Sequence, residues 1–148
     1  VQGKRALEEE NFHVAWSTLK KARRNKTTSE VETLIKKAES GIKYENYLQL
    51  GLEAEEKGEF QEAFIHYEEA YKALQRPGAK TRLEATQELL KQTNELIKKA
   101  EEAIKEQKWE LARTHLQAGQ RIYPKNETIA KLLLQIDELQ KPLEEDSK

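Results

Sequence analysis

Cysteine is absent from the 148 residues of this chain. Its absence excludes disulfide bonds, thiolate nucleophiles and zinc sites built on thiolates. No apolar run approaches the roughly 20 residues that a membrane span requires, and no signal-peptide pattern opens the chain. We therefore expect a soluble, cytoplasmic protein segment that has no membrane span and holds no cofactor.

Glycine and proline are scarce, with 6 and 3 residues, whereas charged and hydrophobic residues each make up 36% of the chain. Glutamate, lysine, alanine, leucine and glutamine are in excess, as in helical proteins with wide solvated faces. The 27 acidic and 26 basic residues nearly cancel, so the molecule has no overall field that would attract nucleic acid. Composition and length thus predict one all-α domain that does not bind nucleic acid.

One local group of basic residues stands out near the end of a predicted helix, formed by Lys20, Lys21, Arg23, Arg24 and Lys26. Cations at a helix C-terminus complement the helix dipole, which is the interpretation we favour. Binding of phosphate or of a membrane surface is the alternative.

Turn residues divide the chain into seven expected helices: residues 4–10, 12–24, 29–57, 60–74, 81–107, 109–122 and 128–141. Gly58 can adopt the left-handed conformation that ends a helix, and Gly41 marks a potential kink or break in the third helix. Ser29 with Glu32 fits a capping box, as does Thr81 with the glutamate three residues later. Two long helices are therefore expected to begin at Ser29 and Thr81.

The short second, fourth and sixth helices share one pattern. Each begins with an aromatic residue, then has an alanine, a large residue and a small residue at fixed intervals. The sets are Phe12, Ala15, Leu19, Ala22; Phe60, Ala63, Tyr67, Ala70; and Trp109, Ala112, Leu116, Gly119. The three alanines are 48 and then 49 residues apart, a period typical of stacked helical repeats. A small side chain at a helix crossing allows two backbones to approach closely, which explains the alanine.

These residues resemble the tetratricopeptide repeat, a helix-turn-helix unit with small and aromatic signature positions. The second unit matches at Tyr47, Leu50, Gly51, Ala54, Gly58, Phe60, Ala63, Tyr67 and Ala70. The third matches at Leu96, Ala100, Ala103, Trp109, Ala112, Leu116 and Pro124, and a truncated first unit keeps Gly3, Ala6, Phe12, Ala15, Leu19 and Ala22. The resemblance implies antiparallel helical-hairpin repeats in one domain, residues 1–141. Its units would span about 1–27, 28–77 and 78–125, with a capping helix at 126–141 and a disordered tail at 142–148.

The period departs from the 34 residues usual for that family, because the first helices of the second and third units are longer. We expect these extensions to pack on each other, within one chain or between two copies of a homodimer. The residues that would mediate this packing are Val31, Leu34, Ile35, Leu83, Leu89 and Leu90. A three-helix domain of the MIT type is an alternative architecture.

The chain shows no arrangement typical of catalysis or metal binding. His66 has Glu62 and Glu69 one turn away on either side, but a solvated surface histidine explains this geometry better than a metal site does. His13 and His115 lie at similar places in their helices, and the many carboxylates lie on ordinary charged faces. The NKT and NET triplets fit the glycosylation sequon, and helix-flanking loops explain them equally well. We expect a protein that is not an enzyme.

A stacked array of this kind offers a concave face formed by its first helices. The resemblance assigns to this face Lys4, Leu7, Leu48, Leu52, Glu55, Ile97, Glu101 and Ile104 as partner-binding residues. Its apolar centre would suit a peptide or an amphipathic helix, and the glutamates would favour a basic one. Alternatively, some of these apolar residues pack under the long helices.

The sequence therefore predicts a protein-protein interaction module, acting as scaffold or adaptor. A regulatory or positioning domain of a larger enzyme or secretion component is the second hypothesis, and a coiled-coil spacer is a third, disfavoured by the alanine spacing. The chain opens inside a helical pattern and without methionine, so we expect a segment of a longer protein.

Overall fold

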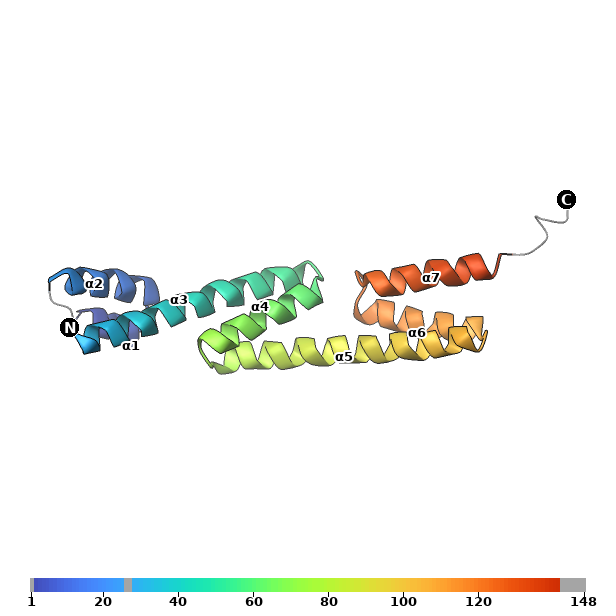
Figure 1. Cartoon of the computed structure of the whole chain (residues 1–148), viewed down its shortest axis with the longest axis horizontal. Coiled ribbons are helices and arrows are strands. Elements are labelled where there is room, and N and C mark those ends of the chain that lie inside the picture. The colour runs from blue at the N-terminus through green and yellow to red at the C-terminus, as the bar shows by residue number, and fades with distance from the viewer. Residues whose placement is uncertain (1, 26–27, 142–148) are drawn as a thin grey trace. The chain divides into compact units, whose positions relative to one another are not determined.

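Seven α-helices and no strand make up the part of the chain that the computed structural model describes, residues 2–25 and 28–141 (Figure 1). The predicted disordered tail, Lys26 of the basic cluster and Val1 lie outside these residues. The all-α prediction is confirmed. The helices are α1 (Gln2–Glu8), α2 (Phe12–Asn25), α3 (Ser29–Glu56), α4 (Phe60–Ala73), α5 (Pro77–Lys105), α6 (Trp109–Ile122) and α7 (Glu127–Leu139).

Most helix ends agree with their sequence signals. Gly58 has φ +75° and lies between α3 and α4, in the left-handed conformation predicted for it. Helix α6 has the predicted bounds, and α7 begins after Asn126, whose side chain accepts a hydrogen bond from the Ile129 amide at 3.0 Å. Such a cap satisfies one of the donors that the first helical turn leaves unpaired.

Helix α3 begins at Ser29 as expected and does not break, but its cap lies one residue earlier than predicted. Thr28, not Ser29, caps it, because the Thr28 hydroxyl accepts a hydrogen bond from the Val31 amide at 3.1 Å. The helix continues through Gly41, which is buried and lies directly against the ring of Phe12 in α2. Gly41 therefore admits a neighbouring aromatic ring and does not kink the helix.

Helix α5 begins four residues earlier than predicted, at Pro77. The capping box at Thr81 and Glu84 was the wrong start, because both residues lie inside the helix. Proline is favoured at the first helical position, where its fixed φ suits a helix and its missing N–H loses no hydrogen bond. Ala79 in the first turn is fully buried, so this added turn takes part in packing.

The chain forms two compact units. Unit 1 comprises Val1–Ala54 and Glu62–Leu83, and unit 2 comprises Glu55–Gln61 and Glu84–Lys148. Unit 1 contains two hydrophobic cores, and unit 2 contains one.

The first core of unit 1 joins α1 and α2 to the N-terminal half of α3, which Figure 1 shows beside these two helices. Ala6, Ala15, Leu19, Ile35 and Ala38 are its buried members. Leu7, Val31 and Leu34 pack against them. The extension of the first long helix thus covers the hairpin that precedes it.

The second core of unit 1 joins the C-terminal half of α3 to α4. Ala54, Ala63 and Tyr67 are buried there, with Leu48, Leu52 and Leu83 packed around them. In unit 2 a third core joins the C-terminal half of α5 to α6 and α7 (Figure 1). Its buried members are Ile97, Ala100, Ala103, Ala112, Leu116, Ile129 and Ile136.

These cores take up four of the six residues that were expected to pack the two extensions on each other. Packing of the extensions between two copies of the chain stays a prediction. Val31, Leu34 and Ile35 belong to the core of the first hairpin, whereas Leu83 belongs to the core of the second. The N-terminal half of each long helix packs against the preceding hairpin. Its C-terminal half is the first helix of the next hairpin. This double use explains why the repeat is 48 or 49 residues long.

Within each hairpin the alanine at the helix crossing is fully buried, as expected for Ala15, Ala63 and Ala112. The small residue seven positions later is buried at Ala70 and Gly119 but exposed at Ala22. Ala22 thus lacks the packing role that the repeat pattern assigned to it.

The turns of the three hairpins also repeat. Glu10, Gly58 and Gln107 all have left-handed backbone conformations, with φ of 58°, 75° and 58°. In the first and third turns the residue that follows donates its amide proton back across the turn, from Asn11 to the Ala6 carbonyl and from Lys108 to the Ala103 carbonyl, both at 2.8 Å. This Schellman-type closure ends the first helix of the hairpin and sets the direction of the second.

Candidate functional site

A pocket of about 640 Å³ opens in unit 1 where the first hairpin meets the end of α4. Helix α1 lines it with Lys4, Leu7 and Glu8, α2 with Phe12, and α3 with Thr33, Leu34, Lys36, Lys37 and Ser40. Ala73, Leu74 and Arg76 complete the lining from the end of α4 and the linker to α5. We call this hollow the junction pocket.

The apolar part of the junction pocket comes from side chains that the local fold holds in place. Phe12 is 8% exposed and lies against Gly41, so its ring is fixed. Leu7 and Leu34 pack against the first core, and Leu74 is half-buried. These positions give the pocket a firm apolar wall that can receive an apolar side chain.

The polar part of the lining is predominantly cationic, with Lys4, Lys36, Lys37 and Arg76 facing one acidic residue, Glu8. Arg76 forms an ion pair with Glu10 at the hairpin turn. The three lysines are exposed, and none of them forms an ion pair with another residue in the described ranges. A chain with net charge −1 thus concentrates positive charge around this pocket.

Unit 2 contains a second junction built from residues at corresponding repeat positions. Phe60 corresponds there to Phe12, and Tyr123 corresponds to Leu74. At the turn and the linker, Gly58 corresponds to Glu10, and Lys125 corresponds to Arg76. The Phe60 and Tyr123 rings meet edge to face with 5.2 Å between their centroids. The Tyr123 hydroxyl accepts a hydrogen bond from the Gln61 amide at 3.4 Å, and Tyr123 is 8% exposed.

One difference between the two junctions is the size of a central apolar side chain. Where unit 2 has the buried phenol ring of Tyr123, unit 1 has the shorter Leu74, which lines the junction pocket. The sequence analysis missed Leu74 and Arg76 as site residues. An alignment of the ends of the two units could have pointed to them, because Leu74 aligns with Tyr123 and Arg76 aligns with Lys125.

The structure places two of the predicted partner-binding residues, Lys4 and Leu7, in the junction pocket. Leu48 and Leu52 pack against the second core. Leu83, from the N-terminal half of the long helix α5, packs against the same core, which is in line with the alternative that some of these apolar residues pack under the long helices.

The remaining predicted residues lie in unit 2. Ile97 is buried in the third core, and Ile104 is half-buried and packs against that core. Glu55 is half-buried and Glu101 is exposed. The binding role of the set as one concave face remains a prediction.

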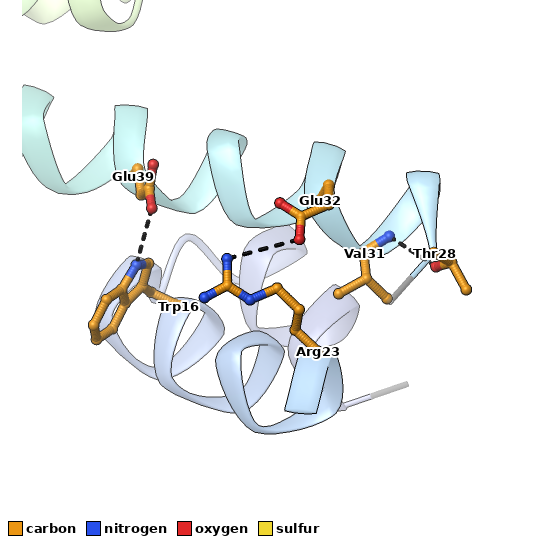
Figure 2. A network of polar contacts seen from close by, with 6 residues as sticks. All are labelled: Trp16, Arg23, Thr28, Val31, Glu32 and Glu39. Carbon is orange, nitrogen blue, oxygen red and sulfur yellow. Dashed lines mark hydrogen bonds and ion pairs between the residues drawn. The ribbon is translucent and has the colours of Figure 1, made fainter. Parts of the chain in front are cut away.

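The basic cluster on α2 lies beside Trp16 and lines a hollow of about 360 Å³ with it. Figure 2 shows how this surface is tied to α3 by side-chain contacts. The Trp16 indole donates a hydrogen bond to Glu39 at 3.3 Å, and Arg23 forms an ion pair with Glu32 at 3.7 Å. Lys20 lies 5.2 Å from the centre of the Trp16 ring. Trp16 and one member of the cluster, Arg23, therefore join α2 to α3.

Metal binding finds no support around the histidines. The His66 ring stacks near Tyr47 with 6.3 Å between centroids, and its Nδ1 atom is buried without a hydrogen-bond partner among the described residues. No group of three histidine, aspartate or glutamate side chains in the described ranges is arranged to hold a metal ion. None of the seven helices is both long and apolar enough to cross a membrane.

Comparison of the chain with protein-family models, with curated proteins and with solved structures gives no match.

Proposed function

We propose that the chain is a non-enzymatic protein-interaction module, a scaffold or adaptor, and that the junction pocket binds a side chain of its partner. The observation that carries this proposal is the pocket itself, about 640 Å³ with an apolar wall and a charged rim. Such a combination suits recognition of a peptide, because the wall provides affinity and the charges provide orientation. The resemblance to tetratricopeptide repeats, which bind protein segments, is in line with this role.

The contact surface proposed here is the junction pocket, and it differs from the concave face expected from the sequence. The resemblance assigned it to the first helices of all units, where Ile97 is buried and the other apolar residues pack against the cores. Lys4 and Leu7 remain in the proposed site, and Phe12, Leu34 and Leu74 join them.

A peptide library displayed on phage tests the proposal. Short random peptides are selected on the purified chain, and their affinity is then measured for the Leu74→Tyr variant. This substitution introduces the residue that unit 2 uses at the corresponding position, so it should fill the pocket and weaken binding by roughly tenfold or more. Circular dichroism and the unfolding midpoint confirm that the variant folds.

The matched control is Leu134→Tyr, the same substitution at a leucine of α7 that is 65% exposed. It should leave peptide binding unchanged. Selection of no binding peptide, or of peptides that bind Leu74→Tyr as well as the parent chain, would refute the proposed site. The hypothesis that the chain only positions neighbouring domains would then be favoured.

A further inference from the structure

The junction in unit 2 gives an internal template for what fits the junction pocket. There the Tyr123 ring stands edge to face on Phe60, buried between the α3–α4 turn and the end of α6. In unit 1 the corresponding aromatic, Phe12, is present, but Leu74 leaves the place of the second ring open as part of the pocket. An aromatic side chain supplied by a partner would restore the edge-to-face contact.

The charged residues of the pocket lining, which we call its rim, favour a negatively charged partner. Lys36 and Lys37 are exposed on α3, Lys4 is exposed on α1, and Arg76 stands at the linker, with Glu8 as the single acidic residue of the lining. A basic segment would be repelled by the lysines, whereas carboxylates would gain favourable contacts without displacing existing ion pairs of those lysines.

From these two observations we infer that the partner is an acidic peptide segment that inserts one aromatic side chain into the junction pocket, between Phe12 and Leu74. The inference rests on the proposed function and specifies the partner's chemistry. The charge of this partner is opposite to that of the basic helix expected from the sequence. That expectation relied on Glu55 and Glu101, which lie outside the pocket lining.

The test compares the peptides that two forms of the chain select from the same phage library. The parent chain should enrich peptides in which a tyrosine, phenylalanine or tryptophan is flanked by aspartate and glutamate. In the Lys36→Glu/Lys37→Glu variant, affinity for those peptides should fall roughly tenfold or more, and selection should shift to aromatics flanked by lysine and arginine. Replacement of the peptide aromatic by alanine should abolish binding.

The matched control is Lys98→Glu/Lys99→Glu, a pair of neighbouring exposed lysines on α5 in unit 2. It makes the same change in net charge but should leave the selected peptides and their affinities unchanged. Raised salt should weaken binding to the parent chain, since the rim contacts are exposed.

The outcomes separate this inference from the proposed function. Peptides that depend on Leu74 but lack acidic flanks, or that bind the charge-reversed variant equally, would overturn the inference and leave the interaction module standing. Peptides that bind the Leu74→Tyr variant as tightly as the parent chain would overturn both the inference and the proposed function.

Discussion

Gly51 of α3 lies directly under the ring of Tyr67 in α4: a Cβ atom at Gly51 would lie 2.6 Å from the Tyr67 Cδ1 atom. The same spacing joins Gly3 to Leu19 in the first hairpin, where an added Cβ would lie 2.6 Å from the Leu19 Cγ atom. In the third hairpin the corresponding residues are Ala100 and Leu116, both buried in one core. At all three crossings a large side chain on one helix is thus paired with glycine or alanine on the other.

This relationship predicts that Gly51→Ala lowers the free energy of unfolding by about 1–2 kcal/mol, because overpacking outweighs the higher helix propensity of alanine. In a Tyr67→Leu background, which recreates the Ala100 and Leu116 pair, the same substitution should be milder by about 1 kcal/mol. Urea unfolding of the four members of this cycle measures the coupling. Equal effects of Gly51→Ala in both backgrounds would show that the Tyr67 ring is not the obstacle.

The left-handed turn residues give a stabilising prediction. Gln107 has φ 58°, a conformation that disfavours side chains, and its backbone amide donates a hydrogen bond to the Ile104 carbonyl at 3.0 Å. Gln107→Gly should therefore raise the free energy of unfolding by about 1 kcal/mol. Thermal unfolding measures it, with Glu102→Gly as control, since glycine inside α5 should lower stability by a similar amount. A destabilised Gln107→Gly variant would contradict the proposed strain.

A third prediction concerns the attachment of α7 to α6. The Arg113 guanidinium contacts Asp137 at 2.7 Å and also donates to the Gln140 side chain, so it binds the last turns of α7. Arg113→Ala should weaken this attachment by about 0.5–1 kcal/mol, since the pair is partly exposed to solvent. Hydrogen exchange of the α7 amides should rise a few-fold. Arg121→Ala, at an exposed arginine of α6, should leave α7 exchange unchanged.

The side chain of Lys72 gives a pH prediction. The hydrogen bond to Glu68 at 3.3 Å, and then the charges of Glu68 and Glu69, raise the pKa of Lys72 above its ordinary value of 10.5. Because the pKa is raised in the folded state, the stabilisation is fully present below the ordinary pKa and is lost as pH rises through the folded value. Stability of the parent chain and of Lys72→Gln should therefore converge at high pH.

This difference should be small at neutral pH and should shrink in salt, because the ion pair is largely exposed to solvent. Lys131→Gln, at an exposed lysine of α7, is the control and should show no such convergence. A difference between parent and Lys72→Gln that persists in strong alkali would contradict the assignment.

Some elements of this fold follow from local residue preferences, and others depend on tertiary contacts. The bounds of α6 and the left-handed Gly58 follow from residues whose preferences act locally, so they were predicted correctly. The start of α5 was missed because a local serine- or threonine-type cap competed with a proline that suits the first helical position. At Gly41 the potential break did not form, because the ring of Phe12 occupies the space beside it.

Some residues of the junction pocket were predicted from the sequence, and others were not. Lys4 and Leu7 were selected from the repeat register, but Leu74 and Arg76 lie beyond the end of α4 and were not. Residues that follow a helix have no periodicity that would predict what they face. The structure brings both residues to the pocket lining, at the position that the buried Tyr123 occupies in unit 2.

By itself the amino-acid sequence determined the helical content, the three hairpins and the small residues at their crossings, because helix propensity, turn chemistry and spacing act over a few neighbouring residues. Only the tertiary structure decided that each long helix covers one hairpin and forms the next, and that a cationic pocket opens beside Phe12. Both depend on contacts between segments far apart in the chain, for which side-chain volume and position in space, not sequence order, set the energy.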